Sequence, residues 1–168
     1  MDPTIEAMVN ELSQEAAATR RLLERVPEGQ LSWRPHAKSM TLGQLALHIA
    51  SIPGDLSRLC QLEEFDASMA NFEPPMPTSQ DQILSAFETG ISDATRYLRT
   101  LTTDAASSPW RLTLRGQEVF TMPRAGLLRS LLLNHWYHHR GQLSVYLRLL
   151  DVPVPVIYGR SADENPFA

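Results

Sequence analysis

The sequence predicts an all-α protein, a four-helix bundle formed as one domain over residues 1–168. Four long segments place apolar residues three and four positions apart, which is the spacing of an amphipathic helix. Stretches that contain proline or glycine separate these segments. The apolar fraction of 43% and the charged fraction of 20% are ordinary for a globular chain, and 168 residues suffice to bury one core.

The first predicted helix begins at Asp2 and Pro3. Aspartate is a favourable N-cap, and proline suits the first helical position. The segment "VPEGQ" ends the helix near Val26. Its apolar positions follow helical spacing and are Ile5, Met8, Leu12, Ala16, Leu22 and Leu23.

The second predicted helix begins at Thr41, which forms a capping-box pattern with Gln44. Its apolar stripe continues to Leu59. Pro53 and Gly54 interrupt this stripe, so we expect a kink or a short break there.

A proline-rich connection over residues 72–80 leads to the third helix. Ser79 and Gln82 form a second capping pattern, and the helical spacing continues to Leu101. The connections before and after this helix are long, which argues against the simplest up-down bundle and permits crossovers.

Residues 110–122, "WRLTLRGQEVFTM", alternate between apolar and polar around a central Arg-Gly. This pattern predicts a short hairpin or extended excursion between the third and fourth helices. Pro123 is expected to open the fourth helix, which continues to about Leu150. The prolines of residues 151–167 predict an extended tail.

Three of the five histidines lie together in "NHWYHHRGQ", residues 134–142, on the fourth helix. At 100° of rotation per residue, His135 and His139 point to the apolar side, and His138 lies about 70° from its centre. His48 lies on the apolar stripe of the second helix. A single histidine there is typical of a hydrogen-bonded core residue, but burying three imidazoles without partners is costly. One divalent cation shared by His48, His135 and His139 would remove that cost.

Three neutral imidazoles leave a coordination position open, as in catalytic rather than closed structural zinc sites. Such a site can lower the pKa of a small thiol or of a water molecule. All-nitrogen ligation suits zinc or nickel first, with iron or copper also compatible. The HExxH motif of metalloproteases is absent, and no carboxylate general base is evident beside the histidines.

Three more residues are candidates for supporting a ligand or contacting a substrate. Gln142 and Tyr146 lie on the same face as His135, where they could equally satisfy polar needs of the core. His138 borders the site or faces a partner. Arg140 is interpreted as a solvated helix arginine rather than an anion-binding group.

The segments "LSWRPHAKSMTLGQLALHIASIPG" (31–54) and "NHWYHHRGQLSVYLRLLDVPVPVIYGRSADE" (134–164) resemble the DinB family of bacterial metal-binding four-helix bundles. The resemblance spans essentially the whole chain, and its most specific part is a helix-two histidine followed far downstream by HxxxHRGQ. It implies that His48, His135 and His139 bind one divalent metal ion. It also implies an up-down-down-up helix order and a homodimer.

Some relatives in that family use thiols: mycothiol-dependent maleylpyruvate isomerase and bacillithiol S-transferases are similar in fold and metal ligands. The leading hypothesis is therefore a metal-dependent enzyme, a thiol S-transferase that joins a low-molecular-weight bacterial thiol to a small electrophilic substrate. Alternatives are a metal-dependent hydrolase and a non-enzymatic, metal-bearing dimer that binds a ligand in a stress response. A metal-free core of hydrogen-bonded histidines is the remaining interpretation.

The charge pattern argues against nucleic acid as a partner, since the net charge is −4 and no Lys/Arg cluster offsets it. No apolar run approaches the ~18 residues of a membrane span, and no segment is typical of a signal peptide. We therefore expect a cytoplasmic protein without a membrane partner. The single cysteine, Cys60, is interpreted as a buried thiol rather than a nucleophile. Trp136 and Tyr137 point away from the histidine face and are candidates for the dimer interface, and His36 is expected at the surface.

Overall fold

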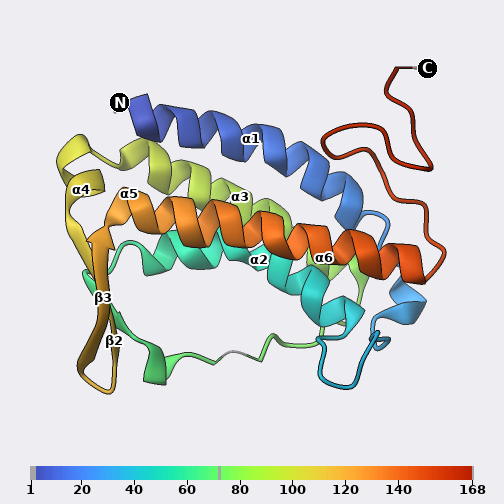
Figure 1. The fold of residues 1–168 in the computed structure, drawn as a ribbon, viewed down its shortest axis with the longest axis horizontal. Helices are drawn as coiled ribbons and strands as arrows, with labels where there is room; N and C mark the ends of the chain where they lie inside the picture. Colours follow the sequence, from blue (N-terminus) through green and yellow to red (C-terminus); the bar gives the residue numbers. More distant parts are fainter. Residues whose placement is uncertain (1–2, 72, 168) are drawn as a thin grey trace.

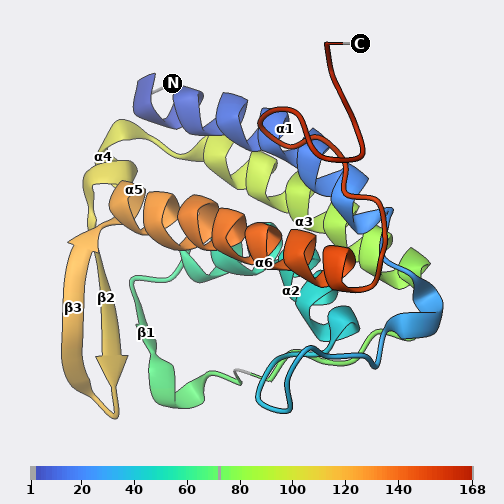
Figure 2. The same ribbon diagram turned by 45° about the vertical axis from the view of Figure 1, so that its right-hand side comes forward.

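The computed structural model describes residues 3–71 and 73–167. Long helices make up most of it and lie side by side (Figure 1). Their bounds are α1 Pro3–Leu23, α2 Leu42–Leu59, α3 Gln80–Thr100, and a last helical run formed by α5 Arg124–Leu127, η3 Leu128–Asn134 and α6 His135–Leu149. Helix α2 packs against α3 and α6, and α1 packs against α3. In Figures 1 and 2, α1 and α6 run in one direction and α2 and α3 in the other.

The predicted starts of α2 and α3 are confirmed by their caps. Thr41 Oγ1 accepts a hydrogen bond from Gln44 N at 3.2 Å, and Gln44 Oε1 accepts one from Thr41 N at 3.0 Å. Ser79 Oγ accepts from Gln82 N at 3.2 Å. These bonds satisfy donors that the first helical turn leaves without partners. The N-cap predicted at Asp2 lies outside the described residues.

Helix α2 continues through Pro53 without a break. Proline has no N–H, so the carbonyl of Ile49, four residues earlier, loses its helical donor. The indole Nε1 of Trp136 donates to that carbonyl at 2.9 Å. The prediction that Trp136 lies at a dimer interface is therefore wrong, because its side chain is fully buried between the helices of its own chain.

Helices α2 and α3 approach each other closely at two glycines. A Cβ atom added to Gly90 would lie 2.9 Å from the carbonyl oxygen of Ala50 and 3.3 Å from Gly54 N. Only hydrogen atoms fit at this contact, which brings the two backbones together beside Pro53.

The last helical run contains a π-helical segment, η3, between its two α-helical parts. His135 N donates to Ser130 O, five residues earlier, instead of four. A uniform rotation of 100° per residue therefore does not hold across this run. The change in rotation alters which residues of α6 face the core, and Trp136, expected to point away from the histidine face, is buried.

The all-α prediction is confirmed in part: the described residues are mostly helical, but a three-stranded sheet accompanies the helices (Figure 2). Strands β2 Pro109–Leu114 and β3 Gln117–Pro123 form the predicted antiparallel hairpin, and β1 Glu64–Asp66 adds to β2 in parallel. Three short helices complete the assignment, and they are η1 Glu28–Gln30, η2 Ala67–Met69 and α4 Thr103–Ser107.

Arg124 connects the start of the last helical run to the end of α2 and to α4. Its guanidinium donates to the carbonyls of Cys60 at 2.6 Å, Leu62 at 2.8 Å and Ala105 at 3.2 Å. The carbonyls of Cys60 and Leu62 lie just after α2, and that of Ala105 lies in α4. The Arg124 side chain therefore joins α5 to these two segments. Burial raises the pKa of the Cys60 thiol to about 12, which agrees with its interpretation as a buried, unreactive thiol.

Arg140 is buried, and the prediction of a solvated arginine is wrong. Its Nη1 lies 2.5 Å from a carboxylate oxygen of Glu15 in α1 and donates to Thr19 Oγ1 at 3.1 Å. Its guanidinium carbon lies 5.0 Å from the ring centroids of both Tyr137 and Tyr158. The ion pair thus connects α6 to α1 and to the C-terminal tail.

The tail is extended as predicted and runs back along α1 and α6 (Figure 2). Arg148 pairs with Asp163, and Arg25 Nη2 lies 3.0 Å from a carboxylate oxygen of Glu164. Val152 and Val154 pack against the core.

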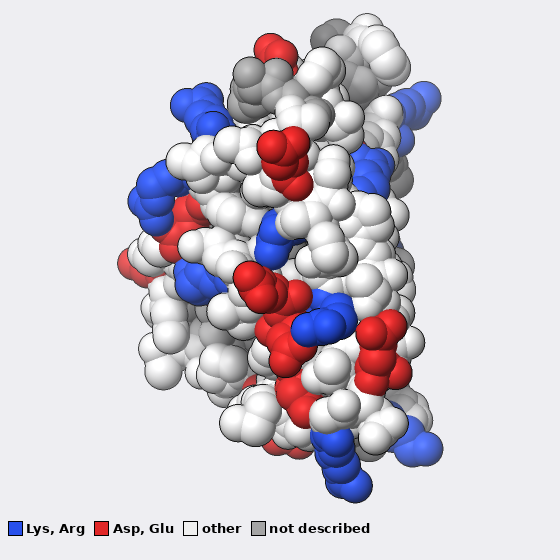
Figure 3. All heavy atoms as spheres, turned by 90° about the vertical axis from the view of Figure 1, so that its left-hand side faces the viewer, with Lys and Arg blue, Asp and Glu red and all other residues white. Residues whose placement is uncertain are grey.

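Acidic and basic side chains are mixed on the end of the molecule that carries α4 and the hairpin (Figure 3). Among the helices of the described residues, none is long and apolar enough to cross a membrane.

Candidate metal centre

Three histidines from two helices converge on one point. His48 comes from α2, and His135 and His139 come from α6. One ring nitrogen from each can be chosen so that all three lie within 4.8 Å of one another. The Nε2 atoms of His135 and His139 are 2.7 Å apart, and the His48 ring centroid lies 5.4 and 4.6 Å from those of the two α6 histidines. This group could hold a metal ion.

Both α6 ligands lie after the π-helical segment, so their spacing of one α-turn is undisturbed. Their imidazoles therefore project from the same face toward α2. The prediction that His135 and His139 form an inward pair used this spacing together with the apolar side of the whole helix, and the two side chains do lie together.

Gln142 sets the tautomer of His139. Its Oε1 lies 2.8 Å from His139 Nδ1, and an amide oxygen can only accept, so Nδ1 carries the proton. The lone pair of His139 is then on Nε2, which faces His135. This is the usual role of the outer partner of a metal-binding histidine.

The electrostatics keep the three rings neutral near pH 7. Burial lowers the pKa of His48 to about 4, and repulsion from His139 and His135 adds to this shift. Burial also lowers the pKa of His135 and of His139. Neutral imidazole is the form that binds a metal ion, so protons do not compete at physiological pH.

The donor set fits a divalent cation. Two nitrogens bound to tetrahedral zinc at about 2.0–2.1 Å stand roughly 3.3 Å apart, so the two Nε2 atoms need to separate by well under 1 Å. His135 Nδ1 is buried without a hydrogen-bond partner in the described part of the chain. Burial lowers the pKa of His135, the Leu131 carbonyl opposes this effect only in part, and no hydrogen bond joins that carbonyl to Nδ1.

A cleft of about 710 Å³ opens in front of the histidines. Its lining residues come from α2, α6 and the loop between η2 and α3, and they are Met40, Leu47, His48, Ser51, Asp55, Asn71, Glu73, Pro74, Pro75, His135 and His139. In Figure 1 that loop runs below α2 and α6.

Sequence reasoning missed the two carboxylates of this cleft, Asp55 and Glu73. Asp55 follows His48 by two helical turns and so shares its face of α2, a spacing that could have revealed it. Glu73 enters from an irregular loop, and no pattern in the sequence places it beside the histidines.

The other predicted residues lie around the cleft rather than in its lining. Gln142 supports His139, as described above. The Tyr146 hydroxyl donates to the Met40 carbonyl at 3.3 Å, and its ring stands edge-on to Trp33. His138 is exposed, with its ring centroid 5.0 Å from that of His139.

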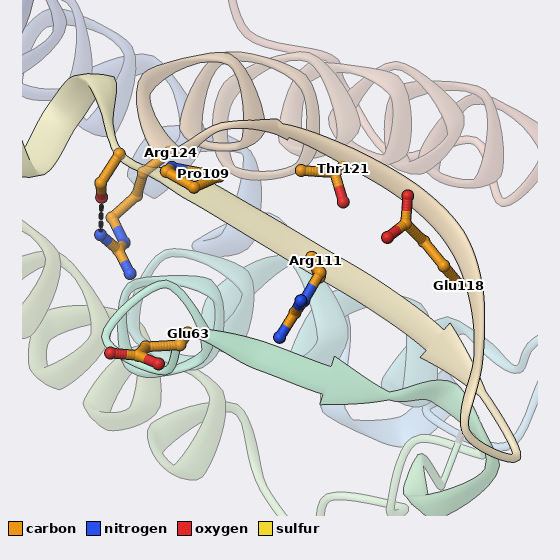
Figure 4. Close-up of a pocket in the computed structure, with 7 residues that line it drawn as sticks. Glu63, Pro109, Arg111, Glu118, Thr121 and Arg124 are labelled. Atoms are coloured by element: carbon orange, nitrogen blue, oxygen red, sulfur yellow. Dashed lines mark hydrogen bonds between the residues drawn. The ribbon is translucent and has the colours of Figure 1, made fainter.

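A second cleft, of about 640 Å³, lies beside the sheet and shares no residue with the first. Figure 4 shows Glu63, Arg111 and Glu118 around it. Arg124 also lines it, but its guanidinium is engaged by the carbonyls described above.

A model of the DinB family matches residues 1–165. The chain belongs to the DinB family. The Bacillus subtilis protein YrdA is 30% identical over 164 residues, which are 98% of this chain and 93% of YrdA.

Two crystal structures share the DinB-like fold. A DinB-like protein of Bacillus cereus aligns with a TM-score of 0.70 at 24% identity, over 91% of this chain and 97% of that protein. Another from Bacillus subtilis has a TM-score of 0.70 at 21% identity, over 92% and 99%.

Proposed function

We propose that this DinB-family protein binds one divalent metal ion, zinc or nickel before iron or copper, through His48, His135 and His139. The observation that carries the proposal is the convergence of three neutral imidazoles in the lining of an open cleft. A closed structural site would need a fourth protein ligand, and the group of potential ligands found in the described residues holds three.

We further infer that the protein is a thiol S-transferase acting on small electrophiles. Bound to the histidines, the ion would lower the pKa of a thiol that approaches it. Gln142 holds His139 in the tautomer that points Nε2 at the ion. The apolar side chains of Leu47 and Pro74 line the cleft where an electrophile would lie.

The net reaction balances without a further reagent. The thiol sulfur forms a bond to an electrophilic carbon, and the leaving group departs with the electron pair of the bond that breaks. The thiol proton passes to solvent. A low-molecular-weight bacterial thiol is the proposed cosubstrate, since some DinB relatives use one.

A metal-dependent hydrolase is the second candidate, and the carboxylates of Asp55 and Glu73 in the cleft favour it. Either could accept a proton from a water molecule activated in the cleft. A non-enzymatic role as a metal-bearing, ligand-binding protein in a stress response is the third.

The proposal also includes one domain over residues 1–168, an up-down-down-up bundle, a homodimer and a cytoplasmic location. Sedimentation should give about twice the 18.9 kDa mass of one chain. A mass near one chain would contradict the dimer alone and leave the metal site unaffected.

Elemental mass spectrometry of untagged protein tests the metal site. Wild type should hold about one equivalent of metal, and a His48→Ala/His139→Ala variant should hold none. His36→Ala is the control, because His36 is exposed and outside the cleft. A wild-type protein that takes up neither zinc nor nickel would overturn the proposal.

Conjugation assays on the loaded protein then test the chemistry. We expect thioether product from a small thiol and a model electrophile, lost in His139→Ala. Hydrolysis without conjugation would favour the second candidate, and ligand-induced thermal stabilisation without turnover would favour the third.

A further inference from the structure

The charged side chains that line the histidine cleft are acidic. Helices α2 and α6 contribute the three neutral histidines and Asp55, and the loop before α3 contributes Asn71 and Glu73. Among the described lining residues the charged ones are Asp55 and Glu73, both acidic, with no lysine or arginine. An anionic ligand group would therefore find no cation from the protein in this lining.

The two carboxylates differ in whether a neighbouring side chain pairs with them. A carboxylate oxygen of Asp55 lies 2.6 Å from Arg58, which also reaches Asp93 at 2.9 Å. The charge of Asp55 is therefore balanced by a neighbour. The Glu73 carboxylate has no ion pair or hydrogen bond within residues 3–71 and 73–167; only its backbone N–H is engaged, by Asn71 Oδ1 at 3.0 Å.

This arrangement restricts the ligand once its sulfur faces the histidines. The positive charge of a bound ion would act first on the sulfur, and the remaining atoms of the ligand would share the cleft with the carboxylates of Asp55 and Glu73. A carboxylate or phosphate there meets a like charge, whereas an ammonium group can form a charge-assisted hydrogen bond. A volume of about 710 Å³ has room for a small thiol and an electrophile together.

We propose that the cleft selects thiols that carry an ammonium group, and that Glu73 is the residue that binds this group. Aminothiols are then preferred over neutral thiols, and anionic thiols are disfavoured. This inference rests on the proposed function, because it requires a thiol to be a ligand of the histidine site.

Three thiols with the same two-carbon spacing provide the probe: cysteamine, 2-mercaptoethanol and 3-mercaptopropionate, which end in an ammonium, a hydroxyl and a carboxylate. The protein is loaded with Co²⁺, and dissociation constants are measured from the sulfur-to-cobalt absorption. The decisive quantity is the ratio of affinities for cysteamine and 2-mercaptoethanol, compared between wild type and Glu73→Gln. The intrinsic acidities of the thiols cancel in this comparison.

Glu73→Gln should lower that ratio by roughly two- to fivefold, as expected for one partly exposed ion pair, and should raise the relative affinity for 3-mercaptopropionate. Cobalt content and the affinity for 2-mercaptoethanol should not change. Glu118→Gln is the matched control, because it removes an exposed carboxylate from the other cleft (Figure 4).

The outcomes separate the two proposals. Thiols that bind with the same ratio in wild type and Glu73→Gln would overturn the role of Glu73 and leave the thiol function intact. If none of the thiols perturbs the cobalt spectrum of the loaded protein, the proposed thiol function fails as well.

Discussion

The indole of Trp136 replaces the hydrogen-bond donor that Pro53 removes from α2. Trp136 Nε1 donates to the Ile49 carbonyl at 2.9 Å, and Trp136 directly follows His135. The contact therefore fixes the distance between the two helices that supply the three histidines. A proline in a helix usually leaves a carbonyl for water or a side chain, and here the side chain comes from the helix that carries the candidate ligands.

Trp136→Phe should destabilise the protein by about 1–3 kcal/mol, because it leaves a buried carbonyl without a donor. The cost should fall when the same change is made in a Pro53→Ala background, where the backbone N–H of residue 53 can donate to Ile49. Urea unfolding of the four proteins gives the coupling energy, expected at ~0.5 kcal/mol or more. Equal costs in both backgrounds would contradict the replacement of one donor by the other.

Gln142→Leu should weaken metal binding by about 10–100-fold, because His139 loses the partner that orients its ring. Stability of the metal-free protein should change little, since Gln142 is exposed. Competition with a chelator measures the affinity. Leu149→Gln, an exposed change on the same helix, is the control and should leave the affinity as it is.

Arg140→Ala should lower the free energy of unfolding by about 3–5 kcal/mol, because it leaves the largely buried Glu15 carboxylate without its ion-pair partner. Arg148→Ala removes an arginine from an exposed pair with Asp163 on the same helix and should cost about 0–1 kcal/mol. Chemical denaturation compares the two. Similar losses for both variants would show that the Glu15 pair contributes no more than a surface contact.

The metal-free protein should lose stability as the pH falls from about 6.5 toward 4. The unfolded chain binds a proton at His48 near its ordinary pKa of 6.5, whereas burial lowers the folded-state pKa to about 4. In this window the unfolded state holds more protons, so acid favours unfolding. The lowered pKa values of His135 and His139 act in the same direction.

Unfolding midpoints in urea between pH 7.5 and 4.5 measure this dependence. His48→Gln should flatten it within that window, and His36→Gln on the exposed loop should not. A wild-type stability that stays level down to pH 4.5 would contradict the lowered pKa of His48.

The long helices and the caps of α2 and α3 could be predicted from the sequence, because apolar spacing and capping residues act over a few neighbouring positions. The hairpin was predictable for the same reason, as Arg115 and Gly116 adopt the positive φ values of 53° and 76° that a tight turn requires. Strand β1 was not, since its three residues carry no alternation and pair with β2, far along the chain.

The candidate site was predictable where it depended on local spacing and not where it depended on folding at a distance. His135 and His139 share a face because they are one turn apart. Arg140 looked solvated because its partners, Glu15 and Tyr158, come from α1 and the tail. Glu73 was missed because a loop brings it to the histidines.

The π-helical segment makes the direction of the candidate ligands depend on how many residues precede them in the last helical run. Arg124 anchors one end of this run to the C-terminal end of α2, and His135 and His139 lie beyond seven π-helical residues. A π-helical segment holds one residue more than the α-helix it replaces, so deleting one residue between 128 and 134 should restore α-helical spacing and keep the imidazoles directed toward α2. A second deletion in the same stretch would shorten a regular α-helix and turn the imidazoles by about 100° relative to the start of the run.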